Sequence, residues 1–299
     1  MQITFGHEVA SAIENRKSVV ALESTVIAHG LPYPQNLETA LGLEEIVRSN
    51  GATPATIAVF NGEFCVGLDS SQIERLATSK DIRKISRRDL PVAVADKLDC
   101  ATTVATTAFV AHRAGIKVFA TGGIGGVHRG FSADVSADLV ELAQTPILVV
   151  CSGAKIVLDL PSTREWLETF GITVLGWQCD EMPAFYSRSS GLPVDQRVES
   201  AKQTVAIADA RDALELSNAI LVTVPVPKEF EIDRAELEAF LKDALENAED
   251  QNISGKEITP FLLSEMSRRS EGRTLASNIA LLENNARVAA EIAAQYQTV

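Results

Sequence analysis

The stretch VVCSGAKIVLDL (residues 149–160) indicates both the fold of this chain and the region where its chemistry lies. It extends an apolar run, ILVVCS (147–152), which is typical of a buried β-strand. The chain then turns at Ser152 and Gly153 and places Lys155 directly before another apolar run. Lysine is among the residue types that are least often fully buried. An amine at the end of a core strand therefore needs an explanation.

Five other short runs are equally apolar, and longer segments with helical periodicity separate them. The strand candidates are SVVALE (18–23), ATIAVF (55–60), KVFAT (117–121), ITVLGW (172–177) and AILVTV (219–224). The helix candidates are residues 36–50, 101–115, 136–144 and 198–217. Strands that alternate with helices predict a layered α/β fold with a largely parallel sheet. Parallel strands that helices cover on both faces are apolar throughout, as these runs are.

From residue 233 on, the helical pattern continues without further strands. Three helices are expected, over residues 233–250, 259–270 and 274–295. No linker rich in Pro, Gly or Ser precedes this segment, so we expect these helices to pack back on the same sheet. The chain, residues 1–299, is therefore predicted to form a single domain.

The composition restricts the classes of protein to consider. The chain has 299 residues, 46% hydrophobic and 22% charged, and its net charge of -13 disfavours nucleic acid and acidic membranes as partners. No signal peptide is evident, and no apolar run approaches the ~20 residues of a membrane span. Cys65, Cys100, Cys151 and Cys179 fit neither a zinc site nor a disulfide framework. We therefore expect a soluble, cytoplasmic protein with reduced thiols.

Polar residues cluster where the predicted strands end, and α/β proteins bind ligands at such ends. They are Glu23, Lys84 with Arg87 and Arg88 in KISRRD, Thr102 and Thr103 at a helix start, and Asp134 and Asp138 in SADVSADL. Each has a structural alternative. Glu23 can be a cap or an ion-pair partner, KISRRD can be a solvated turn, and the two aspartates can cap the helix that begins near Ser136.

The segment GGIGGVHRG (122–130) has four glycines within five residues. Glycines let backbone N–H groups approach a ligand closely and form an anion-binding concavity. The segment is not a dinucleotide-binding fingerprint, because His128 stands where the third glycine would be, and it lacks the Gly-Lys-Ser/Thr of a nucleoside triphosphate loop. It therefore predicts binding of the phosphate group of a small metabolite.

Lys155 is the strongest candidate for covalent chemistry. Its position predicts a strand-to-helix turn, where the positive end of the helix dipole and partial desolvation favour the neutral amine that Schiff-base chemistry needs. Gly153 would leave room for a sugar, and the apolar IVLDL segment would form the helix behind the turn. The alternative is an exposed turn lysine without a function.

Eight motifs occur in order along the chain: ALESTVIAHGLPYPQN, KISRRDL, ATTVATT, FATGGIGGVHRG, SADL, CSGAKIVLDL, DEMPAFYSRSSG and LASNIALLENNARVAAEIA. Together they strongly resemble the pseudouridine-5′-phosphate glycosidase family, which includes the indigoidine-synthase-A-like proteins. The match extends from about residue 20 to the C-terminus. The resemblance implies a three-layer α/β/α sandwich that assembles as a homotrimer.

The resemblance also implies an activity and a set of site residues. The expected enzyme converts pseudouridine 5′-phosphate and water reversibly to uracil and ribose 5-phosphate, an activity classed with the carbon–oxygen lyases. Glu23 would be the proton donor, Lys155 the covalent nucleophile that forms a Schiff base, and Asp134 the ligand of one divalent metal ion, usually Mn²⁺. The implied substrate-binding positions are Lys84, Val104, Ser136, Ala137 and Asp138, and His128 and Asn278 are expected to line the site.

Two positions depart from the family pattern. The insert before Asp134 is short, FSA, so the loop on the metal side is expected to differ. Val224 stands before Pro225, where relatives are expected to have asparagine, so one polar contact is expected to be lost.

Two other functions remain open from the residues alone. A Schiff-base aldolase or lyase that acts on another phosphorylated sugar would share Lys155 and the glycine segment, and product analysis would distinguish it. A non-catalytic metabolite-binding or regulatory protein could keep the same fold. The presence of Glu23, Asp134 and Lys155 together disfavours this second alternative.

Overall fold

One large sheet runs through the computed structural model, which describes residues 2–129, 134–251, 253 and 258–296. Within these residues eleven strands form the sheet and two more form a separate pair. Along the sheet the strands are β1 (Ile3–Phe5), β4 (Glu63–Val66), β3 (Thr53–Phe60), β2 (Val19–Leu22), β7 (Val118–Ala120), β9 (Leu148–Cys151), β13 (Ile220–Thr223), β11 (Thr173–Trp177) and β12 (Gln196–Val198). The strands β5 (Arg83–Ile85) and β6 (Cys100–Thr102) extend it from β3. The separate antiparallel pair is β8 (Val127–His128) with β10 (Leu158–Asp159).

The sheet is largely parallel, as the sequence predicts. Each of the six apolar runs forms a strand, and these six are adjacent in the order β3, β2, β7, β9, β13 and β11 with parallel pairing throughout. The antiparallel pairs are β3 with β4 and β3 with β6. The central strands are fully buried because helices cover both faces, and this accounts for their continuous apolar sequence.

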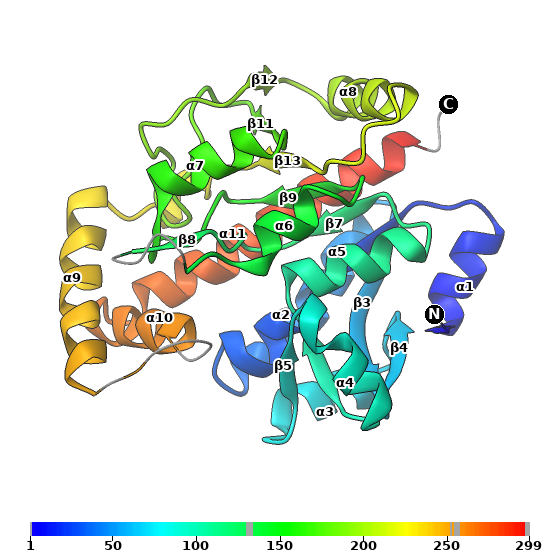
Figure 1. Ribbon diagram of the computed structural model, residues 1–299, viewed down its shortest axis with the longest axis horizontal. Helices are drawn as coiled ribbons and strands as arrows, with labels where there is room; N and C mark the ends of the chain where they lie inside the picture. Colours follow the sequence, from blue (N-terminus) through cyan, green and yellow to red (C-terminus); the bar gives the residue numbers. More distant parts are fainter. Residues whose placement is uncertain (1, 130–133, 252, 254–257, 297–299) are drawn as a thin grey trace.

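Helices cover the sheet on two sides and make the three-layer α/β/α arrangement (Figure 1). In front lie α5 (Val104–Arg113), α6 (Ala137–Leu142) and α7 (Leu160–Thr169). Behind, α11 (Arg273–Gln295) packs on β2, β7 and β9, and it is flanked by α2 (Gln35–Ser49) and α8 (Ala201–Ala213). The remaining helices are α1 (His7–Glu14), α3 (Ser70–Thr78), α4 (Leu90–Ala95) and the short turns η1 (Val26–Gly30), η2 (Arg87–Asp89) and η3 (Lys228–Phe230).

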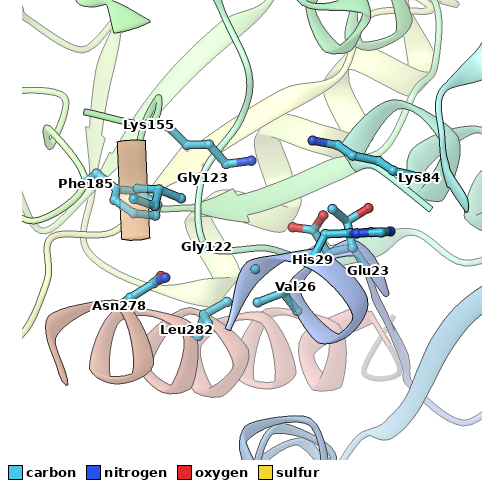
Figure 2. A pocket seen from close by; sticks show the side chains of 13 residues that line it. Glu23, Val26, His29, Lys84, Gly122, Gly123, Lys155, Phe185, Asn278 and Leu282 are labelled. Atoms are coloured by element: carbon cyan, nitrogen blue, oxygen red, sulfur yellow. The ribbon is translucent and has the colours of Figure 1, made fainter. Parts of the chain in front are cut away.

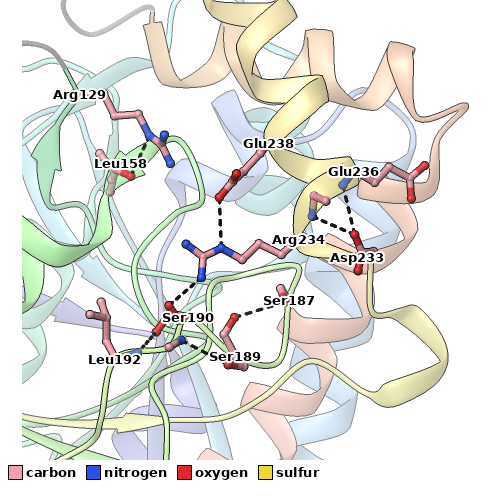
Figure 3. Close-up of polar contacts among 12 residues, drawn as sticks. Arg129, Leu158, Ser187, Ser189, Ser190, Leu192, Asp233, Arg234, Glu236 and Glu238 are labelled. Carbon is pink, nitrogen blue, oxygen red and sulfur yellow. Dashed lines mark hydrogen bonds and ion pairs between the residues drawn. The ribbon is translucent and has the colours of Figure 1, made fainter.

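The C-terminal segment forms the three helices that its periodicity predicts. The last of them, α11, packs on the sheet, whereas α9 (Arg234–Asp250) and α10 (Ile258–Arg269) pack on one another beside one end of it. Figure 3 shows how α9 is fixed: Asp233 caps its first turn, and the Arg234 guanidinium donates to the Ser190 carbonyl at 3.0 Å. This bond ties α9 to the segment that holds Phe185, a residue of the cavity described below.

Two further properties concern the helices and the cysteines. In the part of the chain that the structure describes, no helix combines the length and the apolar composition needed to cross a bilayer. Cys65, Cys100 and Cys151 are buried as unpaired thiols, as predicted. Burial raises the pKa of the Cys151 thiol to about 12. The thiol at the end of β9 is therefore not a competing nucleophile beside Lys155.

Candidate active site

The candidate site lies where the order of the strands reverses. The chain passes from β2 outward to β3 in one direction and from β7 outward to β9 in the other. Ligands of open α/β sheets bind at the carboxyl ends of the strands at such a switch point. The register places Leu22, Ala120 and Val150 side by side. The segments that follow these residues therefore emerge together at one edge of the sheet.

Two adjoining hollows, a smaller and a larger one, open at this edge and share Glu23, Thr25, Lys84 and Lys155. All ten residues that the family resemblance assigns to the site line one or both hollows. They are Glu23, Lys84, Val104, His128, Asp134, Ser136, Ala137, Asp138, Lys155 and Asn278. In Figure 2 the side chains of Lys155 and Lys84 point toward one another across the pocket, and Glu23 and His29 lie beside Lys84.

Glu23 is a buried carboxyl group at the end of β2, and only 8% of the residue is exposed. The Thr121 hydroxyl, at the end of the neighbouring β7, donates a hydrogen bond to Glu23 Oε1. Burial raises the pKa of Glu23, and the opposing effects of Lys155 and Thr121 do not cancel the rise. Glu23 therefore keeps its proton to a higher pH than a solvated glutamate does, which suits a proton donor.

Lys155 lies at the strand end as predicted, but the helix expected directly after it is absent. The segment instead turns into β10, which pairs with β8, and α7 begins only at Leu160, where Asp159 accepts from the Ser162 N–H at 2.9 Å. The expectation that a helix dipole acts on the Lys155 amine is therefore wrong. What fixes Lys155 is its own N–H, which donates to the Ile124 carbonyl at 3.1 Å.

Gly153 is required by the backbone and not by a ligand, so the predicted role for it is also wrong. Its φ is +78°, and a Cβ at this position would lie 2.1 Å from the Pro183 carbonyl oxygen. The space beside Gly153 is thus filled by the chain itself, and the turn before Lys155 needs glycine for that reason.

The glycine segment is more tightly packed than a free anion-binding loop. The Ile124 N–H donates to the Gly153 carbonyl at 3.0 Å, and the Gly125 N–H donates to Asp138 Oδ2 at 2.8 Å. A Cβ at Gly125 would lie 2.2 Å from Ser136 Oγ, and one at Gly126 would lie 2.3 Å from Thr163 Oγ1. The prediction that these amides hold a phosphate is therefore wrong for Ile124 and Gly125, because other groups of the chain occupy them.

Asp138 holds three segments of the site together. Besides the bond to Gly125, its Oδ1 accepts from the Ala105 N–H in the first turn of α5 at 2.9 Å. Asp138 still lines the cavity, together with Ser136, the cap of α6, and Ala137. The carboxylate thus fixes the position of the α5 N-terminus relative to the glycine segment.

The KISRRD cluster divides between two environments. Lys84 and Arg88 line the cavity. Arg87 points away from it, pairing with the buried Glu141 at 2.7 Å and lying over the Phe109 ring. Two of the three basic side chains of this cluster therefore line the cavity.

The two threonines at the start of α5 also lie in different environments. Thr102 is fully buried and donates to the Ile57 carbonyl at 2.7 Å, so the expectation that it meets a ligand at the strand end is wrong. Thr103 lines the cavity, and its buried hydroxyl has no partner among the described residues. Val104 is the first residue of α5 and lines the same hollow, so its backbone N–H is one of the four that the helix itself leaves unpaired.

The residues around Asp134 could hold a metal ion, but only weakly. Asp134 is exposed, lines the larger hollow and accepts at its backbone oxygen from the His128 N–H at 2.9 Å. Over residues 2–129, 134–251, 253 and 258–296, no three His, Cys, Asp or Glu side chains are grouped to hold a metal. A single carboxylate fits a hard ion that keeps most of its waters, such as Mn²⁺ or Mg²⁺. The short FSA insert before Asp134 lies outside the described residues.

The narrower hollow has an apolar end. Val26, Phe185, Leu263 and Leu282 line it beside Asn278 of α11. An apolar slot with one amide suits a flat heterocycle that carries polar edges.

The second departure from the family pattern, Val224, lies in the core at 1% exposure and lines neither hollow.

His29 is a site residue that the sequence reasoning missed, although it stands in the motif that begins with Glu23. It lies in the π-helical turn η1 and lines the pocket, and its buried Nε2 has no partner among the described residues. Burial and the nearby Lys84 lower the pKa of His29. Its imidazole is therefore neutral at pH 7 and offers a hydrogen-bonding nitrogen to a ligand. The π-helical turn that positions the His29 side chain has no recognisable sequence pattern.

Comparisons with known proteins give a consistent result for the family. The family model described as indigoidine synthase A like protein matches residues 8–295. A pseudouridine-5′-phosphate glycosidase of Caldanaerobacter subterraneus subsp. tengcongensis is 53% identical over 295 residues, which cover 98% of this chain and 96% of the relative. The protein of the same name from Geobacillus kaustophilus is 50% identical and covers 97% of both chains.

Two solved structures have the same fold. The prealnumycin C-glycosynthase AlnA, crystallised in complex with ribulose 5-phosphate, is 38% identical and has a TM-score of 0.91 over 100% of this chain and 98% of its own. An indigoidine synthase A-like protein from Thermotoga maritima is 37% identical, with a TM-score of 0.91 over 99% of this chain and 97% of its own. The fold class and the resemblance drawn from the eight motifs are confirmed, and this chain belongs to the indigoidine synthase A like protein family.

Proposed function

We propose that the protein cleaves the carbon–carbon glycosidic bond of pseudouridine 5′-phosphate reversibly, giving uracil and ribose 5-phosphate. One observation supports this more than any other: a buried carboxyl group with a raised pKa, Glu23, and an amine, Lys155, line one hollow on either side of the β7 end. The names of the close relatives agree with the proposal. So does the ribulose 5-phosphate bound by AlnA, which is a sugar phosphate of the same size as the proposed product.

The chemistry of this bond requires an amine. Ordinary glycosidases protonate a leaving heteroatom, but C5 of uracil is carbon, so that route is closed. In the proposed first step the neutral Lys155 amine attacks C1′ and forms a C1′–N bond. The C1′–O4′ bond breaks, and the O4′ oxygen receives a proton from Glu23. The sugar is then open and attached to both the lysine and the base.

In the second step uracil leaves. Glu23, ionised by the first step, takes the extra proton from the Lys155 nitrogen and delivers it to C5; the C1′–C5 electron pair stays with uracil, and the freed nitrogen lone pair forms a C1′=N iminium on Lys155. Water adds to C1′, the C–N bond breaks, and ribose 5-phosphate departs from the regenerated amine. The apolar wall at Phe185 and Leu282 would hold the base, with Asn278 bonding to a polar edge of it. Lys84, Arg88 and Thr103 would hold the phosphate.

The direct test is incubation of the protein with pseudouridine 5′-phosphate and Mn²⁺, with free uracil detected by chromatography. Release of uracil together with ribose 5-phosphate supports the proposal. Cleavage of other sugar phosphates without release of uracil would indicate the Schiff-base aldolase or lyase instead. Binding without any product would indicate the non-catalytic protein.

We propose that Asp134 holds one divalent metal ion, Mn²⁺ by family resemblance. When bound, the ion would polarise oxygens of the substrate or order water molecules. Excess EDTA is expected to abolish uracil release and Mn²⁺ to restore it, because a site with one protein carboxylate exchanges its ion readily. Asp134→Asn should raise the Mn²⁺ concentration needed for half-maximal activity, measured by titrating the chelated enzyme. Full activity in excess chelator would contradict the assignment.

The phosphate is expected to decide which substrates are used. Charge-assisted hydrogen bonds contribute about 1.5–3 kcal/mol each, so pseudouridine should have a kcat/KM at least about 100-fold below that of its 5′-phosphate. Lys84→Met should narrow this difference. Arg83→Met is the matched control, since Arg83 is the exposed neighbour on β5 and lines neither hollow. Equal kcat/KM for nucleoside and nucleotide would place the phosphate elsewhere.

Two further proposals rest on the family resemblance and on the thiols, respectively. We propose that the protein assembles as a homotrimer and that it acts in the cytoplasm. The buried, unpaired thiols agree with a reducing compartment. Sedimentation velocity of the purified protein tests the first of these proposals.

A further inference from the structure

Asn285 is a buried polar residue that touches neither hollow, yet it bonds to both strand ends on which the candidate catalytic groups depend. It lies on α11, on the sheet side, with no exposed surface. Its Nδ2 donates to the Thr121 carbonyl at 2.9 Å and lies 3.4 Å from the Gly122 carbonyl oxygen. Its amide also pairs with the Ser152 hydroxyl, which lies 3.2 Å from Oδ1. A fully satisfied buried amide of this kind fixes one arrangement of its neighbours.

The first partner segment leads to Glu23. Thr121 follows β7, and its backbone oxygen is the one that Asn285 binds, while its hydroxyl donates to the Glu23 carboxyl. A change in the orientation of the Thr121 peptide would therefore displace the hydroxyl that holds Glu23. Asn285 acts on Glu23 through one intervening residue.

The second partner segment leads to Lys155. Ser152 follows β9, its N–H donates to the Gly122 carbonyl at 2.9 Å, and its own carbonyl accepts from the Phe185 N–H at 3.0 Å. Two residues later the parallel bridge of Ile124 with Ala154 continues this pairing up to Lys155. The two strand ends thus run side by side beyond the sheet, and Asn285 bonds to both at the point where they leave it.

We propose that Asn285 is a positioning residue that holds the Thr121–Gly122 and Ser152 segments in register and thereby sets the placement of Glu23 relative to Lys155. This inference rests on the proposed function. A misplacement of about 1 Å in a catalytic constellation costs about 100-fold in rate. The effect is expected in kcat, because the residues that contact the phosphate and the base are left in place.

The test compares two adjacent asparagines of α11. Asn285→Leu removes every hydrogen bond of the Asn285 amide and keeps the number and branching of the side-chain heavy atoms. Asn284→Leu is the matched control, since Asn284 donates to the Pro225 carbonyl at 3.2 Å and touches none of these segments. For Asn285→Leu, kcat should fall about 100-fold with a change in KM below about threefold. For Asn284→Leu both should stay within about twofold of the wild type.

A pH profile separates positioning from a general loss of structure. The charged or titratable groups that face Glu23 are Lys155, Asp138 and Lys84, with His29 in the same pocket. The Thr121 bond opposes the rise of the Glu23 pKa. If Asn285→Leu loosens that bond, the alkaline limb of kcat should move to higher pH. The limb of Asn284→Leu should not move.

A double-mutant cycle completes the test. Thr121→Val removes the hydroxyl through which Asn285 is proposed to act on Glu23. The effects of Thr121→Val and Asn285→Leu on kcat should therefore be strongly non-additive. The effects of Thr121→Val and Asn284→Leu should be additive. Asn285→Ser, which leaves room for a water molecule, is measured alongside in case Asn285→Leu does not fold, and it should show the same fall in kcat and the same shift. If the wild type is active and the folded Asn285 variants keep its kcat and the alkaline limb of its pH profile, the inference is wrong. A wild type that releases no uracil overturns the proposed function instead.

Discussion

Lys155→Ala is expected to lower the rate of uracil release by at least about 10⁴-fold, the order of effect seen when a covalent nucleophile is removed. Without the Lys155 amine the proposed attack on C1′ cannot occur and the sugar cannot be held as an iminium, because Lys84, the other lysine that lines the hollow, is assigned to the phosphate. The protein should remain folded, because the bonds that shape the turn come from the Lys155 backbone and not from its side chain. Uracil release by chromatography and the thermal unfolding midpoint are the two measurements.

Lys202→Ala is the matched control for this variant. Lys202 is exposed on α8 and lines neither hollow, so its removal should leave both measurements unchanged. If Lys155→Ala still releases uracil at a rate near that of the wild type, the amine is not the nucleophile and the proposed mechanism is wrong.

Glu23→Gln is expected to reduce kcat by about 10²- to 10⁴-fold, the usual contribution of a general acid. Glutamine has nearly the same shape and can still accept the Thr121 bond, but it cannot supply the proton that O4′ needs. In the wild type, kcat should fall as the pH rises through the raised pKa of Glu23, because only the protonated carboxyl is active. That alkaline limb should be absent from the profile of Glu23→Gln.

The measurement is kcat against pH for the two enzymes at saturating substrate and metal. Gln203→Glu serves as a charge-changing control that should leave the profile unaltered, because the half-buried Gln203 of α8 lines neither hollow. A Glu23→Gln enzyme with near wild-type kcat and the same alkaline limb would show that another group donates the proton.

The six central strands could be predicted because burial on both faces leaves a continuous apolar record in the sequence. Residues such as Val149 and Leu221 are fully buried, and the segments ILVV (147–150) and AILV (219–222) around them hold no polar residue. The short strands β8 and β10 leave no such record. Each has two residues, and their pairing depends on contacts made only after the chain has folded back.

The site could be located because the carboxyl ends of parallel strands share one edge, which places Glu23 and Lys155 together. The function of individual groups was harder to predict. The Gly125 amide donates its hydrogen bond to Asp138, which lies 13 residues away in sequence. The Thr102 hydroxyl donates its hydrogen bond to the Ile57 carbonyl, 45 residues away. Asn285 contacts Thr121 across 164 residues, and no local pattern encodes that contact.

The proposed mechanism depends on an iminium between the Lys155 amine and the sugar. Its most direct test is reduction of a mixture of the enzyme and ribose 5-phosphate with borohydride, followed by peptide mass spectrometry. We expect one stable adduct, on Lys155, and none in Lys155→Ala. Lys84 faces Lys155 across the pocket and is the sharpest alternative (Figure 2). An adduct on Lys84, or on any other lysine in place of Lys155, would contradict the mechanism.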